Sequence, residues 1–409
     1  MKVILSHSGK QHSYNIAHQL MKFGALKIFI TSSYIKWLFL QRLLRLLKED
    51  FFSKRFLIGL GGSYVNSNWR FEVKEFFLKK LHGINLRTKL AVYERDKAFD
   101  KYVCNYIKKQ DFDIFWGFQG SCLNSIVISN KLNKITICEQ ATIYYPFYSK
   151  IIQEEIQLNP EWEDSMLASF YPDDHLERLI VEPKIADYVF VASTFSKKSL
   201  LDEGINEAKV KVLPLGTDMS NIEVPSDRQK RKPLKVLFVG RVTQEKGIKY
   251  LLEAVKFLGD SVELTIIGKI QGSGKALQEY NGYYTYRAFI KHEDLLNTYK
   301  DYDVLVNPSL FEGFGFVILE AMASGIPVIA TYNSFGPEII KDCENGFLVP
   351  IRDTDAIINS LLKVQNMSDN DYAFMCKLAH SAAKDFTWDK YRIRLENLLN
   401  EIPRVKNGE

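Results

Sequence analysis

Short apolar runs alternate with longer, helix-like segments along almost all of this 409-residue sequence. Runs of this length suit strands that are buried on both faces, as in parallel sheets covered by helices. We expect strands at 3–5, 27–30, 114–117, 135–138 and 188–192, and again at 234–239, 262–267, 283–289, 304–306 and 328–330. Strands that alternate with helices predict an α/β fold with parallel sheets.

A charged segment divides this alternation into two parts. Residues 226–233 read Ser-Asp-Arg-Gln-Lys-Arg-Lys-Pro and lack apolar side chains, as a linker does. A chain of this length also exceeds what one core usually serves. We therefore expect two doubly wound, Rossmann-like domains that face each other across a cleft, with ligands bound at the carboxyl edges of the sheets.

Composition excludes several other classes. A chain that is 46% hydrophobic and 25% charged is neither disordered nor fibrous. The five cysteines are scattered without a C-x-x-C pair, which is typical of free thiols in a reducing compartment. Neither a signal peptide nor an uncharged apolar stretch of bilayer length is visible. We expect a cytoplasmic protein, or one attached to the inner face of a membrane.

Residues 34–90 hold the basic excess of the chain. They contain twelve Lys or Arg against four Asp or Glu, whereas the whole chain carries a net charge of only +5. Segments 34–48 and 71–80 read as basic amphipathic helices, which bind anionic membrane surfaces. The alternative is that their apolar faces pack on the domain and their charges are solvated. Without a recognition motif, nucleic acid is not an expected partner.

The first strand leads into the turn Ser6-His-Ser-Gly-Lys-Gln-His-Ser13. It lacks the P-loop pattern and the G-x-G-x-x-G fingerprint. A polar turn at the carboxyl end of a strand that opens a helix still favours an anion. Gly9 would allow close approach of a ligand, and Lys10 supplies positive charge. The alternative is an ordinary solvated turn.

Two motifs in the second part favour a diphosphate ligand. The stretch Gly240-Arg-Val-Thr-Gln-Glu-Lys246-Gly places Arg241 and Lys246 just past a buried strand, where the two cations can neutralise a diphosphate. By itself this stretch could also be a solvated loop with two routine cations.

The second motif is Glu312-Gly-Phe-Gly-Phe-Val-Ile-Leu-Glu320. Gly313 and Gly315 let backbone amides approach a ligand, and residues 317–324 read as a helix whose first amides face the same anion. The two glutamates can hold two polyols, such as a hexose and a ribose on either side of a diphosphate.

Together these motifs resemble those of retaining GT-B glycosyltransferases of glycosyltransferase family 4, the glycosyl transferases group 1. The resemblance rests on residues 240–247, on the E-x7-E element at 312–320, on Ser324-Gly-Ile-Pro-Val-Ile-Ala-Thr331, and on the passage from 186–188 to 212–218. It implies an acceptor-binding domain at 1–215, a nucleotide-sugar-binding domain at 216–386, and a last helix at 387–409 that packs back on the first domain.

The resemblance also implies roles for single residues. Arg241 and Lys246 would bind the donor diphosphate and, with Glu312, carry catalysis. Glu312 would hold the transferred sugar and Glu320 the ribose, and the nucleotide base would lie near residues 287–290. The full implied donor site is Gly9, Lys10, Gly240, Arg241, Lys246, Ala288, Phe289, Glu312, Gly313, Phe314, Gly315, Phe316, Val317 and Glu320. The acceptor side would include His12 and Glu139, although many relatives have a histidine where this chain has Glu139.

The implied reaction is transfer of a sugar from a nucleotide-sugar, more specifically a UDP-sugar, with retention of configuration. The acceptor would be a saccharide or lipid-linked acceptor of the cell envelope. Two D-x-D pairs, at 111–113 and 301–303, each precede a strand and are expected to flank strand entries rather than hold a metal. We expect no metal or other cofactor. The alternatives are a UDP-sugar 2-epimerase or hydrolase of the same shape and a non-catalytic nucleotide-sugar-binding protein.

Overall fold

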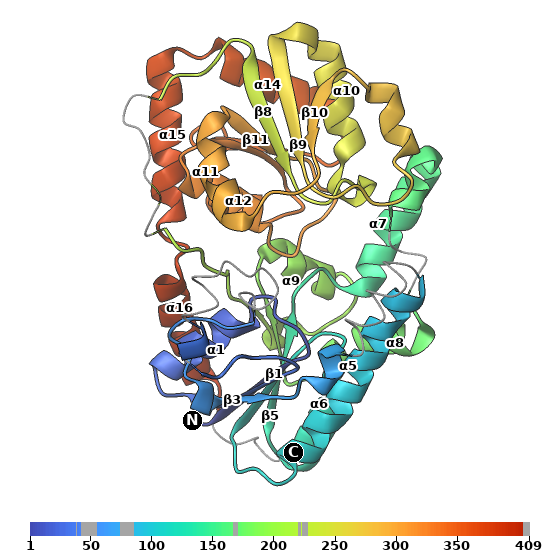
Figure 1. The fold of residues 1–409 in the computed structure, drawn as a ribbon, viewed down its shortest axis with the longest axis vertical. Helices are drawn as coiled ribbons and strands as arrows, with labels where there is room; N and C mark the ends of the chain where they lie inside the picture. The colour runs from blue at the N-terminus through green and yellow to red at the C-terminus, as the bar shows by residue number, and fades with distance from the viewer. Residues whose placement is uncertain are drawn as a thin grey trace.

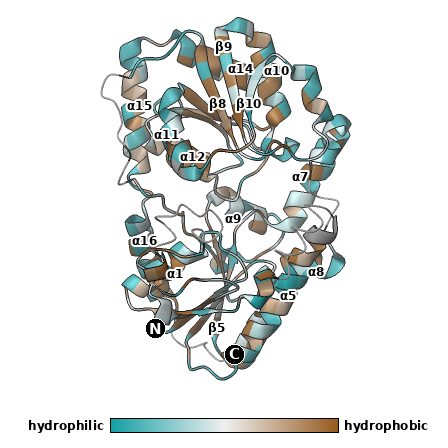
Figure 2. Ribbon diagram, in the orientation of Figure 1, coloured by the Kyte–Doolittle hydropathy of each residue, from teal (hydrophilic) through white to brown (hydrophobic). Residues whose placement is uncertain are grey.

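The computed structural model divides the chain into two halves, each built on its own parallel sheet (Figure 1). It describes residues 1–37, 39–41, 55–73, 86–166, 171–219, 222 and 228–403. Figure 1 shows the amino half below and the carboxyl half above, with helices on both faces of each sheet. In Figure 2 the strands carry mainly hydrophobic residues, whereas the helices mix hydrophobic and hydrophilic ones. The predicted α/β architecture is thus confirmed.

The amino half contains a seven-stranded sheet in the order β3-β2-β1-β4-β5-β6-β7, and each neighbouring pair is parallel. The strands are β1 (Val3–His7), β2 (Leu26–Thr31), β3 (Val65–Ser67), β4 (Ile114–Phe118), β5 (Ile135–Gln140), β6 (Tyr188–Val191) and β7 (Val210–Val212). The order reverses between β1 and β4, so the turns after these two strands leave in opposite directions. Such a switch point is where open α/β sheets bind ligands.

The carboxyl half contains a six-stranded sheet in the order β10-β9-β8-β11-β12-β13, again parallel at each pair. The strands are β8 (Leu234–Val239), β9 (Val262–Ile267), β10 (Tyr284–Arg287), β11 (Val304–Asn307), β12 (Val328–Thr331) and β13 (Gly346–Val349). Here the switch point lies between β8 and β11. The two motif-bearing loops follow these two strands and therefore begin side by side.

The helices cover both sheets. Those of the amino half are α1 (Ser13–Lys22), α5 (Leu86–Ile107), α6 (Leu123–Lys131), α7 (Tyr145–Leu158), α8 (Asp173–Ile185) and α9 (Thr194–Leu201). Those of the carboxyl half are α10 (Ile248–Leu258), α11 (His292–Thr298), α12 (Phe316–Ala323), α13 (Gly336–Ile339), α14 (Thr354–Asn366) and α15 (Asp369–Ala383). The last helix, α16 (Trp388–Glu401), lies in the amino half beside α1 (Figure 1).

The chain passes between the halves through two adjacent segments. The Thr217 amide donates to the Phe386 carbonyl oxygen at 2.9 Å, and a methyl group at Gly216 would lie 2.5 Å from Thr387. After this crossing, α16 buries Tyr391, Leu395 and Leu399 in the core of the amino half. Lys22 of α1 forms an ion pair with Asp389 at 3.4 Å. Of the helix expected at 387–409, residues 404–409 lie outside the described residues.

All ten predicted strands are present, and their ends shift by at most a few residues. The pattern missed β3, β7 and β13, which are only three or four residues long. The helix expected at 317–324 spans Phe316–Ala323.

The basic amphipathic segments can be assessed only in part. Residues 38, 42–48 and 74–80 lie outside the described residues. Of the described neighbours, Trp37 and Phe39 are 74% and 78% exposed. Among the helices that the structure describes, none has both the length and the hydropathy needed to cross a bilayer.

Candidate active site

The loops after β8 and β11 pack against each other at the switch point of the carboxyl sheet. The Leu310 amide donates to the Glu245 carbonyl oxygen at 3.0 Å. Gly247 has a φ of +65°, and a methyl group there would lie 2.0 Å from the Pro308 carbonyl oxygen. Only glycine fits both the left-handed conformation and this contact. The motif residues 240–247 and 308–315 thus form one continuous surface.

Lys246 and Glu312 form the central ion pair of this surface. The Lys246 ammonium donates to Glu312 Oε1, and the Ser309 hydroxyl donates to the same oxygen at 2.9 Å. Their side chains are 20% and 12% exposed, so the pair lies near solvent without being fully in it. A cation and an anion fixed side by side can contact a phosphate and a sugar hydroxyl respectively. Ser309 was not predicted as a site residue.

Arg241 lies at the mouth of the same loop. Its side chain is 51% exposed, its Nη2 lies 3.6 Å from Glu245 Oε2, and its Nη1 donates to Gln271 at 3.3 Å. Gly240, with a φ of +152°, starts the loop. The guanidinium therefore stays accessible to an anion, while Glu245 limits where it can swing.

Glu320 faces a second pair of partners. Glu320 Oε1 lies 2.8 Å from His292 Nε2, and its Oε2 accepts from the Tyr299 hydroxyl at 3.1 Å. The carboxylate is largely buried, whereas the His292 side chain is 65% exposed. Burial raises the pKa of Tyr299, and the carboxylate beside it raises it further, so the hydroxyl remains a donor. Sequence reasoning missed His292 and Tyr299, because their approach to Glu320 depends on how α11 packs on α12.

The residues expected near the nucleotide base lie at the edge of the carboxyl sheet. Ala288 and Phe289 follow β10, which is an edge strand, and Phe289 is 69% exposed. They precede α11, which carries His292 towards Glu320. The contact of His292 with Glu320 therefore links the predicted base-side segment to the predicted ribose-side residue.

The glycines of the second motif have different tasks. Gly315 has a φ of +87° and is the N-cap of α12, so it lets the chain turn sharply before Phe316 and Val317. The first amides of a helix have no intrahelical partner and favour an anion. At Gly313, a methyl group would lie 2.3 Å from the Ala141 carbonyl oxygen of the amino half. Its small size allows contact between the halves. Phe314 is buried against Phe335, with ring centroids 4.2 Å apart.

The turn after β1 occupies the switch point of the amino sheet. Gly9 has no atom within 3.5 Å of where a side chain would begin, and its amide donates to His7 Nδ1 at 3.1 Å. Lys10 lies over the Tyr14 ring at 5.9 Å. Gln11 has a φ of +30°, an uncommon conformation for a non-glycine residue. Burial lowers the pKa of His7 to about 3, so its ring is neutral and can accept the Gly9 amide.

The two acceptor-side residues meet in the structure. His12 Nε2 lies 3.1 Å from Glu139 Oε1, and the Trp116 indole donates to Glu139 Oε2 at 3.2 Å. Both side chains are at least nine-tenths buried. Nothing in their spacing of 127 positions signals this contact, which arises because β1, β4 and β5 are adjacent in the sheet.

The amino and carboxyl sites are in contact through Gly313. Its carbonyl oxygen accepts from the Ser193 and Ser196 hydroxyls at 2.7 and 3.0 Å. Ala141, which packs on Gly313, follows Glu139 by two residues. The His12–Glu139 pair and the Lys246–Glu312 pair therefore lie on opposite sides of one junction.

Three carboxylates of the D-x-D pairs, those of Asp111, Asp113 and Asp303, bind neighbouring residues at strand entries. Asp113 accepts from the Lys2 amide at 2.7 Å, and Asp111 pairs with the Lys2 ammonium at 2.5 Å. Asp303 accepts from the Lys235 amide and from the Arg231 guanidinium, each at 2.8 Å.

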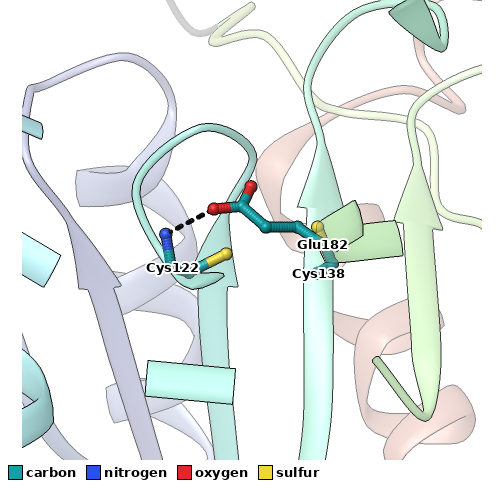
Figure 3. A group of neighbouring side chains, drawn as sticks. All are labelled: Cys122, Cys138 and Glu182. Carbon is teal, nitrogen blue, oxygen red and sulfur yellow. Dashed lines mark hydrogen bonds between the residues drawn. The ribbon is translucent and has the colours of Figure 1, made fainter. Parts of the chain in front are cut away.

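Elsewhere, Cys122, Cys138 and Glu182 place ligand atoms within 4.8 Å of one another (Figure 3). The Glu182 carboxyl group accepts from the Cys122 and Gly120 amides, which fixes the turn after β4. Burial raises its pKa to about 8 and also raises the pKa of the Cys122 thiol. In the structure described, the Glu182 carboxyl group therefore serves the backbone of this turn.

Comparisons with known proteins follow the same division of the chain. Residues 233–366 match the family described as glycosyl transferases group 1. The chain is 28% identical over 228 residues to an uncharacterized 41.2 kDa protein in the cps region of Klebsiella pneumoniae, covering 53% of this chain and 60% of that protein. It is 33% identical over 168 residues to an uncharacterized glycosyltransferase of Methanocaldococcus jannaschii, covering 38% and 41%.

The overall fold also has solved counterparts. The structure of Anabaena HepE in complex with UDP and glucose matches with a TM-score of 0.63 at 15% identity, over 98% of this chain and all of that one. At this identity the match shows the fold. The chain spans 41–60% of the length of the two curated relatives above.

Proposed function

We propose that this protein is a glycosyltransferase. The proposal starts from the match of residues 233–366 to the glycosyl transferases group 1 and from the GT-B fold. It moves a sugar from a nucleoside-diphosphate donor to an acceptor hydroxyl. The observation that carries the proposal is the fixed Lys246–Glu312 pair beside Arg241, at the switch point of the carboxyl sheet. In this arrangement the cation can face the diphosphate and the carboxylate can face the sugar, which are the two groups joined by the bond that breaks.

The cations provide the main catalytic contribution in this scheme. As the bond from the anomeric carbon to the diphosphate oxygen lengthens, negative charge accumulates on the diphosphate. Lys246 is held by Glu312, which in turn accepts from the Ser309 hydroxyl, so the ammonium needs little reorganisation to meet that charge. Arg241 adds a bidentate donor at the mouth. Glu312 accepts from hydroxyls of the transferred sugar, and Glu320 from the ribose.

The finer features of the reaction are also proposals. Retention of configuration follows from the resemblance to family 4. A UDP-sugar donor is supported by the fold match to a protein solved with UDP and glucose. Metal independence is supported by Arg241 and Lys246, which supply the positive charge that a metal would otherwise give.

The acceptor is proposed to be a saccharide or lipid-linked acceptor used in cell-envelope polysaccharide synthesis. It would enter from the amino half, past His12 and Glu139, with Gly9 and Lys10 facing the donor. The cps-region relative supports this role. An anionic membrane surface, contacted through residues 34–90, is proposed as a partner on the ground of their basic excess.

The test is release of nucleotide from a panel of UDP-, GDP- and other nucleotide-sugars without added acceptor. We expect release from one donor, which would identify base and sugar together. A UDP-sugar 2-epimerase or hydrolase would convert the donor at full rate without any acceptor. A non-catalytic binding protein would bind UDP without releasing it from any donor.

A further inference from the structure

Residues 145–166, here called the strap, belong to the amino half by sequence but pack on the carboxyl half. The strap comprises α7 and the short helix η2 (Pro160–Ser165). Figure 1 shows α7 rising from the amino half towards the carboxyl half. Its buried side chains, which include Tyr148, Ile152 and Trp162, share one core with β8, α10 and Phe311. The Tyr148 and Phe311 rings meet edge to face at 5.0 Å.

The strap also bonds to three successive residues of the 240–247 loop. The Thr243 hydroxyl donates to the Ser165 carbonyl oxygen at 2.7 Å, and the Gln244 amide donates to the Ser165 hydroxyl at 3.0 Å. The Tyr148 hydroxyl donates to Glu245 Oε1 at 3.0 Å. These residues lie between Arg241 and Lys246, so the strap holds the stretch that sets the separation of the two cations.

Glu245 transmits this restraint to Arg241. One of its oxygens accepts from Tyr148, and the other lies 3.6 Å from the Arg241 guanidinium. Burial raises the pKa of Tyr148 far above its ordinary value, so the hydroxyl keeps its proton and remains a donor to the carboxylate. Without that bond, Glu245 would be freer to rotate and to take Arg241 with it.

Glu155 is the centre of the contact. It is fully buried, and its Oε1 accepts from Gln244 Nε2 at 2.6 Å and from the Tyr250 hydroxyl at 2.8 Å. Its Oε2 accepts from Arg352 Nε at 2.7 Å. A buried carboxylate with a matched cation and several donors is held in one geometry. Glu155 therefore holds the side chain of Gln244, whereas Ser165 holds its backbone amide.

We propose that the strap positions the donor-diphosphate loop, with Tyr148, Glu155 and Ser165 as positioning residues for Arg241 and Lys246. This inference rests on the proposed function. It means that the amino half contributes to the donor side of the reaction through residues that never touch the donor.

The test compares Tyr148→Phe with Tyr372→Phe. Both remove a buried hydroxyl and keep the ring, but the Tyr372 hydroxyl donates to the Asp303 carbonyl oxygen, away from the loop. We expect Tyr148→Phe to lower kcat for UDP release by about tenfold, with a donor KM that changes far less. Tyr372→Phe should lower the melting temperature about as much as Tyr148→Phe does, but should keep the wild-type kcat. Ser165→Ala should act as Tyr148→Phe does.

A second measurement is independent of turnover. UDP binding by calorimetry should weaken severalfold in Tyr148→Phe and Ser165→Ala and stay unchanged in Tyr372→Phe. If Tyr148→Phe and Tyr372→Phe match in kcat and in UDP affinity, the strap is only structural and the inference is wrong. If the wild-type protein releases nucleotide from no donor, the proposed function fails. In that case the binding comparison still decides the positioning role.

Discussion

Gly313 offers the most direct test of the junction between the two halves, through the substitution Gly313→Ala. A methyl group there would lie 2.3 Å from the Ala141 carbonyl oxygen and 2.8 Å from Thr142 Cα. Ordinary contact begins at 3.4 Å. Because the obstacle is backbone rather than a flexible side chain, the two halves must separate here by about 1 Å.

The magnitude follows from the contacts that would be lost. Overpacking of this kind costs about 1–3 kcal/mol. The hydrogen bonds from Ser193 and Ser196 to the Gly313 carbonyl oxygen, at 2.7 and 3.0 Å, would lengthen and lose about 1 kcal/mol each. We expect the free energy of unfolding to fall by about 3–5 kcal/mol. A displacement of about 1 Å beside Glu312 should lower kcat by about a hundredfold.

The assays are denaturant unfolding and UDP release from the preferred donor. The matched control is Gly61→Ala, since Gly61 has a φ of −64° and a methyl group there would lie 3.4 Å from the Tyr64 ring. That control should change stability by less than about 0.5 kcal/mol. If Gly313→Ala retains the stability and kcat of Gly61→Ala, the junction is not tight and the reasoning is refuted.

Four further outcomes are expected. Lys246→Met should lower kcat for nucleotide release by about 10²–10³, and an unchanged kcat would remove Lys246 from the mechanism. EDTA should leave release unchanged, whereas a loss restored by Mg²⁺ would contradict metal independence. Burial raises the pKa of Glu182 from an ordinary 4.5 to about 8 in the folded state. Between pH 4.5 and pH 8 the folded state therefore keeps a proton that the unfolded state releases. Stability should therefore fall as pH rises from 4.5 to 8, and unfolding curves of Glu182→Gln should show a flatter fall. In a flotation assay, the protein should float with anionic liposomes. If it floats with neither anionic nor neutral liposomes, the role proposed for residues 34–90 is refuted.

The strands were predictable because a strand that is buried on both faces is a continuous run of apolar residues. Strand β4 reads Ile-Phe-Trp-Gly-Phe with every position buried, and such a short apolar run is typical of a strand in the interior of a parallel sheet. By contrast β7, Val210-Lys-Val212, has too few apolar residues to stand out. Its place at the edge of the sheet depends on pairing with β6.

The site divides in the same way. The donor-binding roles of Arg241, Lys246, Glu312 and Glu320 stay predictions, but their positions were predictable because each lies in a compact motif after a buried strand. Their partners were not, since Ser309 is an ordinary loop serine and His292 approaches Glu320 from another helix.

The sequence by itself determined the α/β class, the two parallel sheets and the motif loops at their carboxyl edges, because each of these is written in short stretches of chain. Tertiary structure alone decided that His12 meets Glu139, that Gly313 serves the junction between the halves, and that the strap packs on the carboxyl half. Glu155 illustrates the reason. It lies in a polar stretch of α7, and only the contacts from Gln244, Tyr250 and Arg352, which come from distant segments, allow a charge to be fully buried there.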